Sequence, residues 1–273
     1  MAYSGSRGWM RTIAALARQV VREGMRQHVV VGFCVAYALF VGGTGILRTL
    51  HFGHEQLEFV TRLGLAGASL AGALCTIVLT VHFFLGEFED GAALVLFTKP
   101  VTLFDYVLGK WFGTTVLLGG FFGWVAVVLV LQLHLTGVAA RGEGMQHLRL
   151  EIIAGCILEW IKCGLLCAAV QCVAAFLRTR VLATLTGLVV LVLCHVRPLL
   201  DEAVARIGPP LVRMAIKALV RMVPDFRFLD LDWGESGAIS AALPAVAVST
   251  AYGIVYLVGL LLVGGLILRR REL

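Results

Sequence analysis

Apolar runs of about twenty residues recur along this chain and are separated by short polar stretches. A helix of that length covers roughly 30 Å, which is the thickness of the hydrocarbon core of a bilayer. Hydrophobic residues make up 59% of the 273 residues and charged residues only 15%, which leaves little material for a water-exposed surface. None of the runs alternates apolar and polar residues, as a membrane β-barrel would. The sequence therefore predicts an all-α polytopic membrane protein.

The apolar runs define six predicted membrane spans in one transmembrane domain over residues 28–273. These spans are residues 28–47, 63–85, 111–135, 152–177, 181–196 and 245–268. Because the number is even, both termini are expected on one side of the membrane. The short loops assigned to the outside, 48–62 and 137–150, carry few basic residues: Arg48, Arg62, Arg141 and Arg149. The positive-inside rule therefore favours cytoplasmic termini.

Residues 1–27 precede the first span and form a basic amphipathic segment. On a helix, apolar residues line one side and arginines another: Trp9, Ile13, Leu16 and Val20 against Arg11, Arg18 and Arg22. This pattern predicts an interfacial helix on the cytoplasmic leaflet, where basic side chains meet anionic lipid. A disordered basic tail is the alternative.

A polar patch over residues 86–110 interrupts the apolar pattern between the second and third spans. It carries six charged side chains: Glu87, Glu89, Asp90, Lys99, Asp105 and Lys110. Unpaired charges are costly in hydrocarbon, so the patch is expected outside the lipid, on the cytoplasmic face. Residues 92–97 are apolar and compatible with a helix, and Pro100 ends any helix begun there. The pattern predicts a short amphipathic helix with acids at its start and Lys99 at its end, as a helix dipole favours.

Two other spans carry signals of their own. The second is rich in small residues, which predicts close helix packing: Gly64, Gly67, Ala68, Ala71 and Gly72. The fourth holds Glu159 and Lys162, which are three residues apart and can pair on one helical face. Intramembrane charges usually face a bundle interior or a wet cavity. A transport route and a purely structural ion pair are both open for them.

Residues 197–243 form a long segment that is not apolar enough to be a span. Apolar and basic residues alternate at helical spacing in its first half, and Pro209-Pro210 would divide that half into two helices. The tract from Val223 to Gly234 has the composition of a loop. We expect an extracytoplasmic amphipathic region that rests on the outer membrane surface or dips into it.

Motifs for independent catalysis are missing. A P-loop needs GxxxxGK followed by Ser or Thr, but Phe104 and Trp111 replace the leading glycine and the hydroxyl around Gly109-Lys110. The sequence contains no GxSxG or HExxH motif, and its seven cysteines form no CxxC pair. We therefore predict no catalytic, cofactor or metal site and no enzyme activity in this chain alone. The net charge of +6 is assigned to membrane orientation rather than to nucleic acid.

Three short motifs in the polar patch resemble the permease subunit of type-2 ABC exporters. They are Glu87-Phe88-Glu89-Asp90-Gly91, Phe97-Thr98-Lys99-Pro100-Val101-Thr102 and Tyr106-Val107-Leu108-Gly109-Lys110. The arginine-rich stretch over residues 266–273 is also similar to that family. At Thr102-Leu103 the sequence departs from the family, which often has Ser-Arg there, so a contact made by that arginine would be absent.

The resemblance implies a role for residues 86–110 as a coupling segment that docks into a separate ABC ATPase. The implied coupling residues are Glu87, Glu89, Asp90, Gly91, Lys99, Pro100, Gly109 and Lys110. It also implies a second permease copy, ATP and Mg²⁺ bound by the partner ATPase, and a bacterial inner membrane. Export of a substrate is the first hypothesis. Mechanical work or delivery to an extracytoplasmic partner is the second, and a membrane enzyme or channel acting alone is the third.

Overall fold

The computed structural model describes residues 6–44, 56–89, 102–136, 143–177, 179–205, 213–214, 216, 224–226 and 239–270. Within these residues the protein contains seven long helices and no strand, which confirms the all-α prediction. The helices are α1 (Ser6–Arg26), α2 (Val29–Thr44), α3 (Gln56–Glu89), α5 (Leu103–Thr136), α6 (Glu143–Ala174), α7 (Arg180–Ala205) and α9 (Ile239–Arg270).

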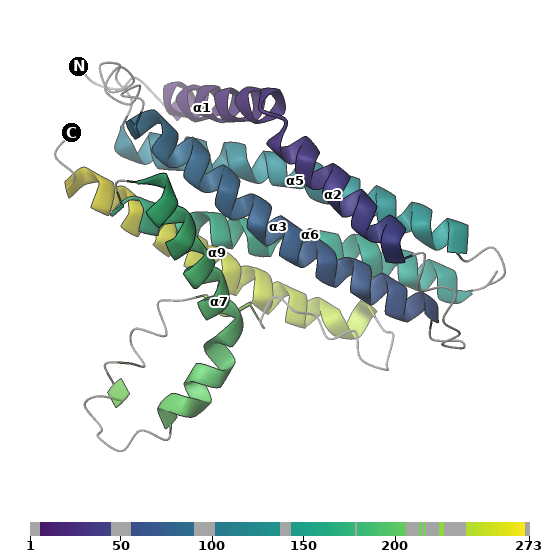
Figure 1. Cartoon of the computed structure of the whole chain (residues 1–273). Helices are drawn as coiled ribbons and strands as arrows, with labels where there is room; N and C mark the ends of the chain where they lie inside the picture. The colour runs from purple at the N-terminus through teal and green to yellow at the C-terminus, as the bar shows by residue number, and fades with distance from the viewer. Residues whose placement is uncertain are drawn as a thin grey trace.

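The long helices α3, α5, α6 and α9 lie side by side as a bundle (Figure 1). Helix α1 begins and α9 ends at the same end of this bundle, and α7 crosses it steeply so that its C-terminal part leaves the other helices. The close packing predicted for α3 is confirmed by its glycines. A Cβ atom added to Gly64 would lie 2.5 Å from Leu129 Cδ2 on α5, and one added to Gly72 would clash with the Phe122 ring on the same helix.

Five of the described helices are long and apolar enough to cross a membrane: α3, α5, α6, α7 and α9. Within the described residues the predicted first span is represented by α2, which has 16 residues and so covers about 24 Å. Helices α1 and α2 pass the same test together, with a bend of 56° between them. The described residues therefore confirm a multi-span membrane protein, and the sixth span stays a prediction.

Several helices extend beyond the predicted spans. Helix α3 has 34 residues and begins at Gln56, and α6 begins at Glu143. The outer loops predicted at 48–62 and 137–150 therefore contain residues that are helical, and these loops are shorter than predicted. Val60 and Thr61 are buried in the bundle, which explains why the helix continues through this polar sequence. A helix of 34 residues is roughly 50 Å long, so it projects beyond a hydrocarbon core of about 30 Å.

The helix predicted within residues 1–27 is confirmed as α1, and it packs lengthwise on α5. A Cβ atom added to Gly109 would lie 2.6 Å from Leu16 Cβ, and one added to Gly113 would lie 2.7 Å from Val20 Cβ. One added to Gly24 would meet Leu117 Cδ1 at 2.5 Å. The apolar side of α1 is therefore occupied by protein.

His28 makes the bend between α1 and α2. Its φ angle of 56° lies in the left-handed region, which ends a helix because the chain turns away from the helical path. Its carbonyl accepts the N–H of Gly32 at 2.8 Å, so the same residue starts α2. Farther along, the Trp124 indole N–H donates to Cys34 O (3.3 Å) and the Gln132 amide donates to Thr44 Oγ1 (2.7 Å). The bent pair thus follows α5 from Gly109 to Gln132.

The predicted outer region 197–243 is only partly a separate region. Its first residues belong to α7, which continues to Ala205, and its last belong to α9, which begins at Ile239. Between them, Pro224, Asp225 and Phe226 are buried rather than looped into solvent. The predicted coupling helix at residues 92–97 lies outside the described residues.

Candidate functional site

A buried ion pair joins the end of α3 to the start of α5. Lys110 Nζ donates to Glu87 Oε1 at 2.5 Å, and the two side chains are 1% and 17% exposed. The ammonium also lies 5.5 Å from the centre of the Tyr106 ring, close enough for a cation–π contact. Removing one partner of a buried pair leaves an uncompensated charge, so each residue depends on the other.

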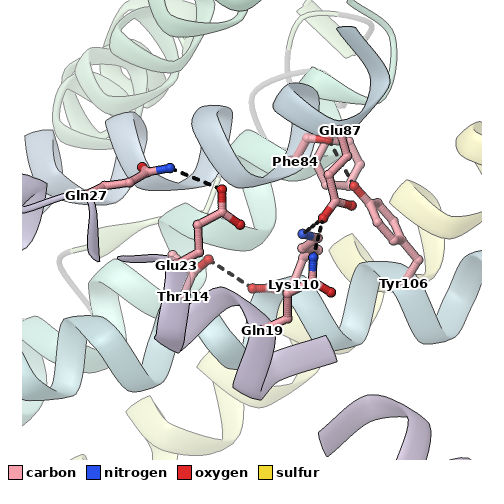
Figure 2. A network of polar contacts seen from close by, with 8 residues as sticks. All are labelled: Gln19, Glu23, Gln27, Phe84, Glu87, Tyr106, Lys110 and Thr114. Carbon is pink, nitrogen blue, oxygen red and sulfur yellow. Dashed lines mark hydrogen bonds and ion pairs between the residues drawn. The ribbon is translucent and has the colours of Figure 1, made fainter. Parts of the chain in front are cut away.

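The same Glu87 oxygen is also bound by α1. Gln19 Nε2 donates to Glu87 Oε1 at 3.1 Å, so one carboxylate joins α1, α3 and α5 (Figure 2). On α5, Thr114 Oγ1 donates to the Lys110 carbonyl at 2.9 Å, and Gln27 Nε2, directly after α1, donates to Glu23 Oε1 at 3.1 Å. Figure 2 shows Gln19 of α1 and Lys110 of α5 meeting at the Glu87 carboxylate, with the Gln27–Glu23 contact apart from them.

Aromatic side chains hold the two helix ends next to this pair. The Tyr106 hydroxyl donates to the Phe84 carbonyl at 3.1 Å, and both side chains are buried. The Phe88 ring meets the Tyr106 ring edge-on with their centres 5.8 Å apart. These contacts fix how α3 and α5 approach each other immediately before the segment that connects them.

The start of α5 is set by a reciprocal cap. Thr102 Oγ1 accepts the N–H of Asp105 at 3.2 Å, and Asp105 Oδ2 accepts the N–H of Thr102 at 3.1 Å. This arrangement is a capping box with Asp in the acidic position. It satisfies two of the free N–H groups of the first turn and fixes the register that places Lys110 opposite Glu87.

A second acid at the end of α3 binds the start of α7. Glu89 Oε2 lies 2.5 Å from Arg180 Nε, and Glu89 Oε1 accepts the Arg180 backbone N–H at 3.0 Å. A carboxylate at a helix N-terminus is favoured by the helix dipole. The two side chains are about one-third exposed, at 33% and 35%, so solvent weakens this pair.

Four of the predicted coupling residues therefore meet at one place. Glu87, Glu89 and Lys110 are in the polar network, and Gly109 beside them admits Leu16 of α1. Asp90, Gly91, Lys99 and Pro100 lie outside the described residues. Gln19, Tyr106 and Arg180 were not among the predicted site residues. Gln19 is 68 positions from Glu87, and no local pattern relates residues so far apart.

The predicted ion pair on α6 is present but lies elsewhere. Lys162 Nζ donates to Glu159 Oε1 at 2.7 Å, with side chains 9% and 15% exposed. Along α6 it lies between Gly155, which faces Leu65, and Cys163, which faces Gly72. Both contacts involve the first half of α3, so this pair is far along the bundle from Glu87.

Another polar group ties the buried piece 224–226 to α7 and α9. Arg197 Nη1 and the Asp225 N–H both donate to the Tyr252 hydroxyl oxygen, at 3.1 and 3.0 Å. The Phe226 ring meets the His195 ring edge-on at 5.5 Å. Within the described residues no group of three His, Cys, Asp or Glu side chains could hold a metal ion.

No protein-family model matches this sequence, and no curated protein matches it. At the end of α3, Glu87 binds α1 and α5 and Glu89 binds α7.

Proposed function

We propose that this chain is the membrane-spanning permease subunit of an ABC exporter, driven by an ATPase on a separate chain. The observation that carries the proposal is the network at the end of α3. Glu87 binds α1 and α5, Glu89 binds α7, and both precede residues 90–101, which form the middle of the polar patch. Force applied to that segment would be passed to four helices at once.

Physical coupling needs a rigid connection between the driven segment and the helices that move. Glu87 precedes residues 90–101 and Lys110 follows them, and the two side chains form an ion pair. This pair joins the two helix ends from which residues 90–101 extend. Because Glu87 and Glu89 already bind groups within the chain, we assign them to force transmission. Direct contact with the ATPase is assigned to Asp90, Gly91, Lys99 and Pro100.

The proposed working unit follows from the resemblance and from the missing P-loop. It contains two permease copies, identical or different, and two ATPase subunits that bind ATP and Mg²⁺. The unit sits in a bacterial inner membrane with both termini of this chain in the cytoplasm. This chain has no enzyme activity of its own in the proposal.

Affinity purification of the chain from its native membrane in mild detergent tests the proposal. Mass spectrometry should find a stoichiometric ABC ATPase. A pure oligomer of this chain, with no ATPase, would overturn the proposal and favour a channel or enzyme built around Glu159 and Lys162.

A second measurement tests the assigned residues. In the assembled complex, Glu87→Gln and Glu89→Ala should lower ATP turnover about fivefold or more, the lower range of typical coupling energies. Arg62→Gln, an exposed change near the start of α3, is the matched control and should leave turnover unchanged. Normal turnover in fully assembled Glu87 and Glu89 variants would contradict their role.

Delivery to an extracytoplasmic partner is the second candidate function. It is favoured by the anchoring of Asp225 and Phe226 on α9 and α7, which ties one point of the segment between these helices to the bundle. Pull-down of an outer protein that is lost when residues 227–238 are replaced by a Gly-Ser linker would support delivery. Transport of a substrate in vesicles without any such protein would support export instead.

A further inference from the structure

The exposed side of α1 carries a stripe of arginines. Arg11, Arg18, Arg22 and Arg26 are all exposed, and their spacing repeats with the helical turn. They point away from the side that packs on α5 through Leu16 and Val20. The α1 sequence contains a single acid, Glu23, which accepts a hydrogen bond from Gln27.

Three of these arginines line an open hollow of about 820 Å³. Arg18, Arg22 and Arg26 follow one another at four-residue intervals, and Gln19, Glu23 and Gln27 line the hollow beside them. Like charges at this spacing repel one another on a helix. An anion placed between them would remove that repulsion and accept hydrogen bonds from the planar guanidinium groups, which suit phosphate.

The position of these arginines along the bundle indicates which kind of anion lies close to them. Val20 lies opposite Gly113, only three residues beyond Lys110, where the charged base of α5 gives way to its apolar run. Helix α2, which is entirely apolar or weakly polar, begins three residues after Arg26. Exposed Met10 and Met25 flank the stripe, at 56% and 61% exposure. A cationic surface with apolar edges at this level fits the headgroup layer of a bilayer.

We propose that Arg18, Arg22 and Arg26 bind the phosphate of an anionic phospholipid headgroup. The bound lipid holds α1 in place on α5, and so also keeps Gln19 on Glu87. The proposal needs only a membrane-embedded chain and does not rest on the proposed transport function.

Native mass spectrometry of the full chain, released from nanodiscs that contain phosphatidylglycerol and phosphatidylcholine, tests the site. Wild-type protein should retain phosphatidylglycerol. The double variant Arg18→Gln/Arg22→Gln should bind it about 30-fold more weakly, from about 1 kcal/mol per arginine near an anionic surface. The matched control Arg62→Gln/Arg269→Gln removes two exposed arginines elsewhere and should retain the lipid.

Unchanged retention in the double variant, or an equal loss in the control, would overturn the proposal. Displacement of the lipid by millimolar inorganic phosphate would show a site for soluble anions and would also overturn it. If the double variant does not fold, the thermal stability of the wild-type chain tests the lipid site instead. Phosphatidylglycerol should raise the unfolding temperature over phosphatidylcholine, and salt should cancel the increase. Equal unfolding temperatures in the two lipids would reject the site.

Discussion

At the scale of single residues, the ion pair between Glu87 and Lys110 matters because it is buried and shared. Lys110 is 1% exposed and Glu87 also accepts from Gln19. A charge in such a place depends on its counter-charge, since little water reaches the pair to replace a lost partner. The pair therefore makes the α3 and α5 ends interdependent.

Replacing one residue of this pair should lower the free energy of unfolding more than replacing both residues. Lys110→Met should lower the free energy of unfolding by about 3 kcal/mol, because Glu87 is left without its counter-charge. The double variant Glu87→Gln/Lys110→Met should lose clearly less, since no charge stays behind. Unfolding in mixed micelles with increasing SDS measures both values. A double variant as unstable as Lys110→Met would contradict the dependence.

A buried glutamine on α6 gives a second residue-scale prediction. Gln171 is 1% exposed, and within the described residues neither its amide nitrogen nor its oxygen has a hydrogen-bond partner. Replacing such a group with an apolar one of similar shape removes a desolvation cost, so Gln171→Met should raise the free energy of unfolding by about 1 kcal/mol.

The matched control for Gln171 is Gln132, which is 8% exposed and donates to Thr44 Oγ1 at 2.7 Å. Gln132→Met should lower the free energy of unfolding by about 1 kcal/mol, since it leaves the Thr44 hydroxyl without its donor. Thermal unfolding in detergent compares the stabilities of the Gln171→Met and Gln132→Met variants. A loss of stability in Gln171→Met would show that the amide holds a bound water or ligand.

At the scale of elements, the contact between α1 and α5 depends on glycine. An added Cβ at Gly113 would lie 2.7 Å from Val20 Cβ and 2.9 Å from the Ala17 carbonyl oxygen, which is backbone and cannot turn aside. Gly113→Ala should therefore separate the helices and cost about 2 kcal/mol, as overpacking does.

Gly120 on the same helix is the control for Gly113, because an added Cβ there meets nothing within 4 Å. Gly120→Ala should be neutral or stabilise the chain by about 0.5 kcal/mol through helix propensity. Protease cleavage within α1 should accelerate in Gly113→Ala and stay unchanged in Gly120→Ala. Equal cleavage in the two variants would show that α1 does not depend on this contact.

The turn between α1 and α2 should prefer glycine. His28 has a φ angle of 56°, which costs a side-chain-bearing residue about 1 kcal/mol. His28→Gly should therefore keep or raise the unfolding temperature, and His28→Val should lower it, because a β-branched residue tolerates this conformation worst. A valine variant as stable as wild type would mean that the bend is made in another way.

At the scale of the whole molecule, the path of α1 and α2 along α5 decides the number of crossings. The pair follows α5 from Gly109 to Gln132, a distance of roughly 35 Å. Because the arginines of α1 belong at the level of the headgroups, we expect α2 to pass through the hydrocarbon and α1 to lie at one end of this crossing. Phe104 at the start of α5 lies beside Gly265 near the end of α9, so these two ends share a side.

Labelling of single introduced cysteines with a membrane-impermeant maleimide tests this topology. Trp9→Cys, Thr102→Cys and Arg269→Cys should react from one side of the membrane, and Phe59→Cys and Leu135→Cys from the other. The native cysteines are free but buried or half-buried in helices, which keeps the background low. Labelling of Trp9→Cys together with Phe59→Cys would show that α2 does not cross.

Much of the helical architecture could be predicted from apolar spacing, since a bilayer requires each crossing to be a helix of about twenty residues. The close packing at Gly64 and Gly72 and the pairing of Glu159 with Lys162 were also predictable, because they depend on short, regular spacings. Helix ends were less predictable, since burial of Val60 and Thr61 extends α3 through polar sequence.

The amino-acid sequence alone established a membrane-embedded, all-helical chain with acids gathered where α3 ends. The partners of those acids required the folded structure. Lys110 is 23 positions from Glu87, Gln19 is 68 and Arg180 is 91 from Glu89. Such contacts follow from how whole helices pack, and no local period encodes them. The helical spacing predicts that the arginines of α1 share one side, and the packing of the opposite side on α5 is what leaves them exposed.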